Sequence, residues 1–410
     1  MSGTWPHING ATDNKSTLSR KFQCLPEMLG DPDYRTGYFG KWHLGDEFSA
    51  QRGFQEWGST EEYFKSAMAN EKIKGQSDYT KFLLSKGYKP HPQKGQTFGR
   101  PFVSKLPFEL SKPKFLETKA CDFLHRYRDE PFILFVAFYE PHPPYNGPFN
   151  SEHPLERVSP DPTAGDVFGD DIPLRYRLEQ EQIRKRVATA DKFRGIKQRY
   201  LGLITEIDRS IGTILAKLDD LGLTEHTITL LTSDHGDMMS AHGLLGKRLM
   251  FEQSACVPYL VRQPAQRPLH CLQPISHIDF APTILDLMGK PPHPQCVGQS
   301  RANLIRGEMS APDLVFFEWS PPKRILDGDS KLASKEDIQR CLSESTRIVV
   351  SPDGWKLCLR DKDKSELYNL RDDIGEQHNL YYGGGHRDVI AKLTDEIHRW
   401  QERTNDSLKI

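Results

Sequence analysis

The sequence has no excess of positive charge and no long apolar run, and each absence excludes a class of protein. Its 55 Lys and Arg residues are balanced by 56 Asp and Glu residues, which gives a formal net charge of -1. A nucleic-acid-binding protein usually carries a basic excess, so no nucleic-acid partner is expected. No apolar segment approaches the roughly 20 residues that span a bilayer, so no membrane span is expected either.

The sequence also lacks a paired cysteine motif and a secretory signal. Its 7 cysteines are scattered, with no C-x-x-C pair, so neither a zinc site nor a redox motif is indicated. An odd count argues against a full disulfide framework and favours reduced, packed thiols. The segment Met1–Arg20 has neither the charged start nor the apolar stretch of a signal peptide. The residues themselves therefore assign no compartment.

Short apolar runs alternate with helical patterns, which indicates an α/β fold. The 410 residues are 37% hydrophobic and 27% charged, as in a globular protein with a sizeable core. Phe132–Phe138 and Thr227–Thr232 read as buried strands. Between them, apolar residues recur at helical spacing from Tyr200 to Leu218, and Gly222 follows as a C-cap. We expect an α/β/α sandwich around a mixed, mainly parallel sheet.

A smaller C-terminal antiparallel subdomain is expected to follow. Turn signals separate short strand-like pieces at Leu314–Phe317, Thr346–Val350, Trp355–Leu359 and Glu366–Leu370. An amphipathic pattern from His386 to Trp400 predicts a closing helix. The expected division is a catalytic domain at 1–312 and this subdomain at 313–410.

Polar residues gather where the predicted strands end, which is where open α/β sheets bind ligands. Lys41 and His43 follow Thr36–Gly40, His142 follows Phe132–Phe138, and Asp234 and His235 follow Thr227–Thr232. A further cluster runs from His242 to Lys247. Taken singly, each of these residues could have a purely structural role, because Asp and His are common in turns and lysines are common on protein surfaces. Together they indicate an anion-binding hydrolase and leave a metal site open.

These residues match a family. Thr36–Gly45, which ends in Gly-Lys-Trp-His-Leu-Gly, resembles the second signature of the sulfatases, with a shortened spacing to Tyr34. Thr232–Asp237, followed by His242 and Lys247, resembles the metal-and-lysine block of that family. Sulfatases belong to the alkaline-phosphatase superfamily. The resemblance runs from about Gly3 to Leu380.

The resemblance implies a role for each candidate residue. Asp234 and His235 would bind one divalent metal, which is usually calcium in this family. Because many relatives have an asparagine at the position of His235, and histidine is a softer ligand, manganese is an alternative. Lys41 and Lys247 would hold the sulfate oxygens. His43 would assist at the nucleophile and His142 would donate a proton or hydrogen bond to the leaving alcohol. His242 is a candidate contact to the substrate.

One part of the family pattern is missing from the sequence. Sulfatases carry an Asp-Asp or Asp-Asn metal motif and then C-x-P-S-R or S-x-P-S-R, whose first residue becomes the formylglycine nucleophile. Met1–Gly10 resembles the segment that follows this nucleophile, and Cys24 is not followed by the required Ser and Arg. We therefore expect an N-terminally truncated chain that lacks the first strand, with an unpaired edge or gap in the sheet.

The expected reaction is hydrolysis of a sulfate monoester on a carbohydrate or an aryl alcohol. Two alternatives stay open: a catalytically inactive remnant that binds anions or glycans, and a phosphonate monoester hydrolase or phosphodiesterase on the same scaffold. We expect the segments Asn146–Asp171 and Gln51–Pro107 to shape the substrate site, and their sequences do not identify the substrate. Family members are often periplasmic or secreted. The sequence assigns no oligomeric state.

Overall fold

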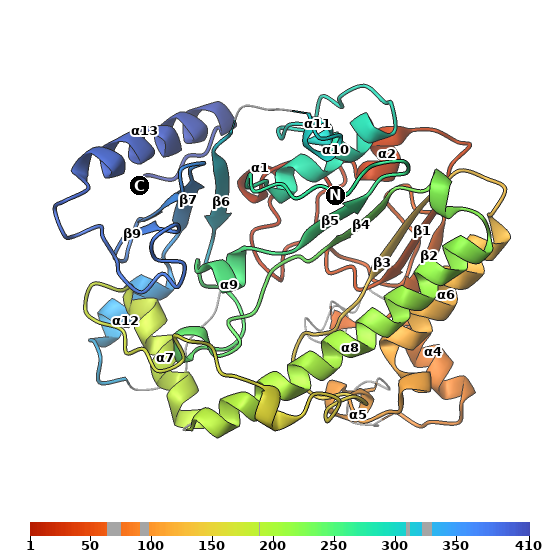
Figure 1. Cartoon of the computed structure of the whole chain (residues 1–410), viewed down its shortest axis with the longest axis horizontal. Coiled ribbons are helices and arrows are strands. Elements are labelled where there is room, and N and C mark those ends of the chain that lie inside the picture. Colours follow the sequence, from red (N-terminus) through yellow and green to blue (C-terminus); the bar gives the residue numbers. More distant parts are fainter. Residues whose placement is uncertain (64–74, 91–97, 188, 309–311, 322–329) are drawn as a thin grey trace.

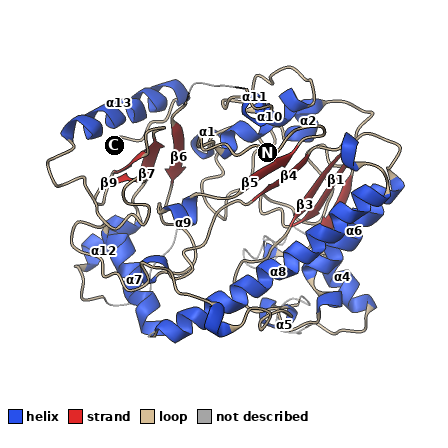
Figure 2. Ribbon diagram, in the orientation of Figure 1, coloured by secondary structure: helices blue, strands red, loops and turns tan. Residues whose placement is uncertain are grey.

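A computed structural model of the chain describes residues 1–63, 75–90, 98–187, 189–308, 312–321 and 330–410 (Figure 1). Parts of the expected substrate segment Gln51–Pro107 therefore lie outside the described residues. The expected α/β class is confirmed: a parallel sheet and two antiparallel sheets are packed with helices (Figure 2). None of the described helices combines the length and apolar character needed to cross a membrane. All seven cysteines are free thiols.

The parallel sheet has three strands, with β1 (Arg35–Gly40) between β2 (Glu56–Ser59) and β3 (Phe132–Ala137). Neighbouring residues of β1 point to opposite faces. Phe39 packs into a cluster with α4 (Asp78–Ser85) and α6 (Lys112–Arg126), and α6 also packs along the long helix α8 (Ala190–Asp220). On the opposite face Tyr38 stacks on Trp57, and the β3 residue Phe135 contacts Phe280 of α10 (Phe280–Leu287). Helices thus cover both faces of this sheet.

Helix α8 matches its sequence pattern and extends it. Thr189 caps its N-terminus by accepting a hydrogen bond from the backbone of Lys192, and Gly222 follows its last turn with φ +69°. The predicted helix from Tyr200 to Leu218 is confirmed and begins earlier, at Ala190.

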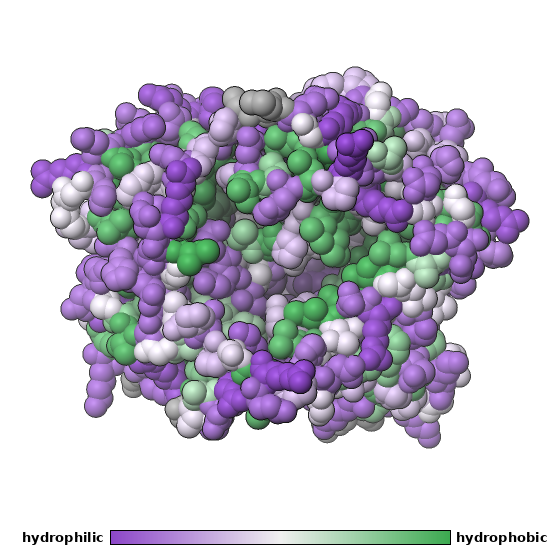
Figure 3. Space-filling model, in the orientation of Figure 1, coloured by the Kyte–Doolittle hydropathy of each residue, from purple (hydrophilic) through white to green (hydrophobic). Residues whose placement is uncertain are grey.

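A second sheet consists of β4 (Thr229–Thr232) and β5 (Tyr259–Arg262), which are antiparallel. Among the described residues, β4 pairs only with β5, and β3 pairs only with β1, so no backbone pairing joins these two sheets. Leu231 and Leu260, paired across this ladder, are 41% and 60% exposed. On the side of the molecule seen in Figure 3, apolar side chains surround a hollow between β4–β5 and α8.

The C-terminal sheet is antiparallel, as the sequence predicts, and its four described strands lie side by side in chain order. Helix α13 (Arg387–Thr404) covers one face and adds Leu393, Ile397 and Trp400 to its core. Trp5 packs edge-on against Trp400 at 5.1 Å, so the N-terminal segment shares this core. The division at 312/313 stays a prediction. The strands are β6 (Val315–Trp319), β7 (Thr346–Val350), β8 (Trp355–Arg360) and β9 (Glu366–Asn369).

The remaining helices are short or connect the sheets. Helix α7 packs against α12, and the guanidinium of Arg360 in β8 donates to Tyr176 of α7 at 2.6 Å. These helices are α1 (Pro6–Asn9), α2 (Leu25–Leu29), α5 (Arg100–Val103), α7 (Leu174–Arg186), α9 (Glu252–Ala255), α11 (Ala302–Ile305) and α12 (Lys335–Leu342).

Candidate active site

Lys41 and Tyr139 meet because β1 and β3 end side by side. The backbone N–H of Lys41 donates to the carbonyl oxygen of Ala137 at 3.0 Å, which continues the ladder past the end of β1. The ammonium nitrogen of Lys41 lies 5.7 Å from the centroid of the Tyr139 ring. The parallel register therefore places a cation beside the loop that follows β3.

His142 is held by the start of that loop. Its Nδ1 lies 2.6 Å from the Tyr139 hydroxyl and 2.9 Å from the carbonyl oxygen of Pro143, to which the hydroxyl also donates. A carbonyl only accepts, so the proton belongs on Nδ1 and Nε2 presents a lone pair. Burial and the charges of Lys247 and Lys41 lower the pKa of His142 to about 4. The imidazole of His142 is therefore neutral at pH 7.

His43 has a strained backbone and lies close to the same cations. Its φ of +60° is in the left-handed region, which non-glycine residues rarely adopt. Its ring stacks on Tyr63 with the centroids 4.5 Å apart. Burial, Lys41 and Lys247 lower the pKa of His43 to about 4. Lys41 and Lys247 therefore lie near enough to His43 and His142 to lower the pKa of both imidazoles.

Asp234, His235 and Lys247 gather beyond β4. The Nδ1 of His235 donates to the carbonyl oxygen of Gly236 at 2.8 Å, so its Nε2 keeps a lone pair. Lys247 Nζ lies 2.5 Å and Asp234 Oδ2 3.5 Å from this Nε2. Burial raises the pKa of Asp234, but His235, Lys41 and Lys247 outweigh it and lower the pKa. Burial and Lys41 lower the pKa of Lys247 to about 8.

Asp237 organises the loop that carries Lys247. Its Oδ1 accepts hydrogen bonds from the backbones of Met239 at 3.0 Å and Gly246 at 2.9 Å. Its Oδ2 accepts from the Tyr145 hydroxyl at 2.7 Å, which ties this loop to the one after β3. Sequence reasoning did not single out Asp237 for this role, although it follows Asp234 and His235 within the same motif.

Comparison with known proteins identifies this arrangement. Residues 1–290 match the family model described as Sulfatase. The chain belongs to the sulfatase family. It is 25% identical over 432 residues, covering 100% of the chain and 76% of the relative, to the uncharacterized sulfatase YidJ of Escherichia coli strain K12. It is 23% identical over 461 residues, covering 100% of the chain and 77% of the relative, to an N-acetylglucosamine-6-O-sulfatase of Bacteroides thetaiotaomicron.

A likeness in fold to a solved hydrolase structure extends over nearly the whole chain. The structure of a phosphonate monoester hydrolase from Silicibacter pomeroyi superimposes with a TM-score of 0.74 at 19% identity, covering 99% of this chain and 85% of that one. At this identity the likeness concerns the fold.

A divalent metal of the kind that sulfatases generally use fits two of the donors. His235 donates its Nδ1–H to a backbone carbonyl, which is the usual arrangement of a metal-binding histidine, and the nitrogen that would bind an ion, Nε2, lies 2.5 Å from Lys247 Nζ. Asp234 Oδ2 lies 3.5 Å from that nitrogen, close enough for both to bind one ion. No cluster of three or more His, Cys, Asp or Glu suited to a metal occurs in the described parts of the chain.

His242 lies in a different environment from the other candidates. Its side chain is 1% exposed, stacks on Phe251 at 4.3 Å and lies 3.1 Å from Asp166 through Nδ1. None of its described contacts involves Lys41, His142 or Lys247. Its contact with substrate stays a prediction.

Cys24 is the N-cap of α2 and is fully buried. Burial raises the pKa of its thiol to about 11. A buried, protonated thiol is a poor nucleophile, which agrees with its mismatch to the family motif.

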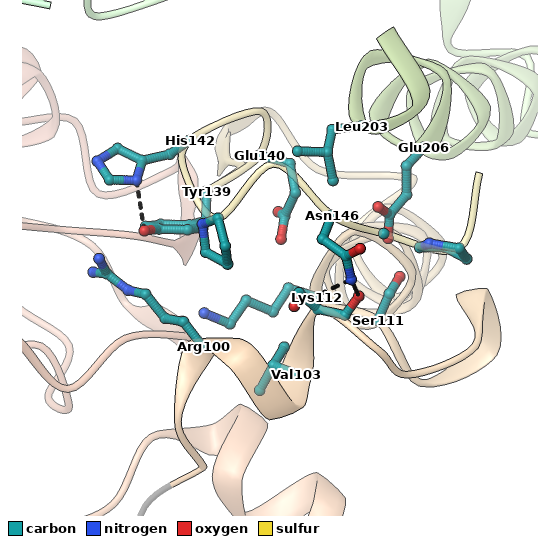
Figure 4. Close-up of a pocket in the computed structure, with 14 residues that line it drawn as sticks. Arg100, Val103, Ser111, Lys112, Tyr139, Glu140, His142, Asn146, Leu203 and Glu206 are labelled. Atoms are coloured by element: carbon teal, nitrogen blue, oxygen red, sulfur yellow. Dashed lines mark hydrogen bonds between the residues drawn. The ribbon is translucent and has the colours of Figure 1, made fainter. Parts of the chain in front are cut away.

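The pocket next to His142 contains residues that sequence reasoning missed (Figure 4). Arg100, Lys112 and Tyr139 line it, and Glu61 pairs with both Arg100 and Lys112. Tyr139 directly follows a predicted strand, so the strand-end argument could have found it. Arg100 and Lys112 follow no apolar strand, and nothing in the local pattern marks them.

Proposed function

We propose that this sulfatase hydrolyses sulfate monoesters of carbohydrates or of aryl alcohols. The observation that carries the proposal is the position of two lysines beyond the strand ends, in a protein whose net charge is only -1. Lys41 lies 5.7 Å from the ring of Tyr139, which contacts His142, and Lys247 lies 2.5 Å from His235. A cationic rim of this kind attracts a singly charged ester by its local field. The activity named for the Bacteroides relative supports the carbohydrate class.

Each residue has a step that suits its geometry. Lys41 and Lys247 donate to the sulfate oxygens and offset the charge that develops on them. His142 stands at the leaving oxygen, with Nδ1 held by Tyr139 and Pro143 and Nε2 left to exchange a proton. The bound anion offsets the nearby cations, so the pKa of His142 rises when substrate enters. A divalent ion on Asp234 and His235 supplies Lewis acidity when bound.

A second candidate is hydrolysis of phosphonate monoesters. The Asp234–His235 pair and the fold shared with a phosphonate monoester hydrolase favour it. The 410 residues contain neither C-x-P-S-R nor S-x-P-S-R, so neither activity is assigned a nucleophile within them.

Turnover of two esters distinguishes the candidates. Protein isolated from its own host, which carries whatever processing it receives there, is assayed with 4-nitrophenyl sulfate and an aryl phosphonate. The proposal expects a higher kcat/KM for the sulfate, whereas a higher value for the phosphonate would support the second candidate. Binding of a sulfate ester without turnover of either compound would leave an anion- or glycan-binding protein.

A further inference from the structure

Three cations surround the ring of Tyr139, which is 6% exposed. The Nζ of Lys41 lies 5.7 Å, the Nζ of Lys112 4.7 Å and the guanidinium carbon of Arg100 4.6 Å from its centroid. Figure 4 shows Arg100 and Lys112 on one side of the ring and His142 on the other. A positive region therefore continues from Lys41 past Tyr139 to Arg100.

A single carboxylate pairs with both cations of the pocket. Glu61 accepts from the buried Lys112 through Oε1 and from Arg100 through Oε2, the latter at 3.1 Å. One negative charge thus faces two positive ones. The other two carboxyls that line this pocket, Glu140 and Glu206, have raised pKa values because they are buried, to about 8 for Glu206. The neutral form of Glu206 is therefore favoured at pH 7, and Lys41 adds a third cation beside the Tyr139 ring.

Arg100 is the cation of this pair that a ligand can reach. Its side chain is 40% exposed, whereas that of Lys112 is 6% exposed. Its hydrogen bond to Glu61 uses Nη2, and no other hydrogen bond is described for its guanidinium. A planar guanidinium anchored on one edge presents its remaining N–H groups in a fork that suits a carboxylate or a sulfate.

We propose that Arg100 binds a second negatively charged group of the substrate, on the leaving-alcohol side of the ester. The substrate class is then a sugar sulfate that carries another anion, either a second sulfate or a carboxylate. This inference rests on the proposed function, because it needs Lys41, Lys247 and His142 to hold the first sulfate. Arg100 acts as a specificity-determining residue and takes no part in the proton transfer.

Calorimetric titration of the full chain tests the inference with three probes at one ionic strength: a glucose monosulfate, a glucose disulfate and a sulfated glucuronic acid. The wild type should bind one or both doubly charged sugars about tenfold more tightly than the monosulfate, since a hydrogen bond to a charged group is worth that much. Which sugar is preferred identifies the second group as sulfate or carboxylate. Arg100→Gln should remove the preference and keep the affinity for the monosulfate.

Arg209→Gln is the matched control. Arg209 is also half exposed, pairs with Glu152 at 2.8 Å and stacks on Phe149 at 4.1 Å. Its replacement by Gln therefore removes one positive charge, one ion pair and one cation–π contact, as Arg100→Gln does. It should keep the wild-type preference. Arg100→Lys keeps the positive charge but not the forked N–H groups, so it should show an intermediate preference for the doubly charged sugars. If Arg100→Gln does not fold, Arg100→Lys serves as the test variant.

Three results would overturn the inference. Equal affinity of the wild type for all three sugars would refute it and leave the proposed function standing. A preference that survives in Arg100→Gln would assign the second anion to another residue. Failure of the wild type to bind any of the three would refute the proposed function and this inference together.

Discussion

The hydroxyl oxygen of Tyr139 lies 2.6 Å from Nδ1 of His142, and both groups reach the carbonyl oxygen of Pro143. Because the carbonyl only accepts, the proton is on Nδ1 and Nε2 stays available to a substrate. The hydrogen bond to Tyr139 joins His142, which we propose transfers the proton, to a ring that Lys41 and Arg100 flank. Tyr139 therefore connects the proposed sulfate-binding residue Lys41 to the proposed leaving-group residue His142.

Tyr139→Phe should slow turnover without unfolding the protein. The ring remains for Lys41 and Arg100, but the hydrogen bond to His142 is lost. One hydrogen bond contributes about 0.5–1.5 kcal/mol, so kcat on aryl sulfate should fall about three- to tenfold. Tyr127→Phe, which loses a 2.5 Å hydrogen bond to Glu56 outside the site, should keep wild-type kcat. Equal kcat in both variants would show that the hydroxyl does not position His142.

The low pKa of His142 predicts that acid destabilises the fold. Burial, Lys247 and Lys41 lower this pKa to about 4, against about 6.5 in an unfolded chain. Between these values the unfolded chain binds a proton that the folded chain does not, so the free energy of unfolding falls as the pH drops through this window. Urea titrations should show a shallower fall in His142→Gln. His398→Gln, at an exposed histidine of α13, should keep the wild-type slope, and identical slopes in all three proteins would contradict the account.

Calcium or manganese should raise the melting temperature through Asp234 and His235. Two donors bind weakly, so we expect the shift at metal concentrations on the order of millimolar. Asp234→Asn should reduce the shift, while Asp395→Asn, which removes an exposed carboxylate of α13, should not. Thermal unfolding with and without each metal measures this. A shift of equal size in Asp234→Asn would place the metal elsewhere.

Gly236→Ala should destabilise the loop beyond β4. A Cβ at this position would lie 2.0 Å from the carbonyl oxygen of Gln253, closer than atoms can approach. Overpacking of this kind costs about 1–3 kcal/mol of unfolding free energy, measured in urea. Gly212→Ala is the control, because Gly212 lies within α8 with no atom within 4 Å of its Cβ position. Alanine there should leave stability unchanged or raise it by up to about 1 kcal/mol, since it favours helix.

Local patterns were enough to predict much of the fold. The apolar run at Phe132–Phe138 and the helical spacing from Tyr200 to Leu218 correspond to β3 and α8. The antiparallel pairing of β4 with β5 could not be predicted this way, because the register between distant segments leaves no mark in either sequence.

In the candidate site too, some residues could be predicted from local sequence patterns and others could not. Lys41, His142 and Asp234 follow strands directly, so the rule that ligands bind at strand ends singles them out. Arg100 and Glu61 come from segments without a clear period and meet only through tertiary packing around Tyr139. Sequence reasoning therefore singled out the residues that we propose bind the sulfate group, and it missed those that we propose bind the second anion.

The most direct test of the central claim is calorimetric titration of the 410-residue chain with 4-nitrophenyl sulfate. The account predicts binding in roughly the millimolar range or tighter, weakened at least about tenfold by Lys247→Ala and by Lys41→Ala. Lys81→Ala, at an exposed lysine paired with Asp78, should bind like the wild type. Unchanged affinity in both site variants, or no binding by the wild type, would contradict the assignment of these two lysines to the sulfate group.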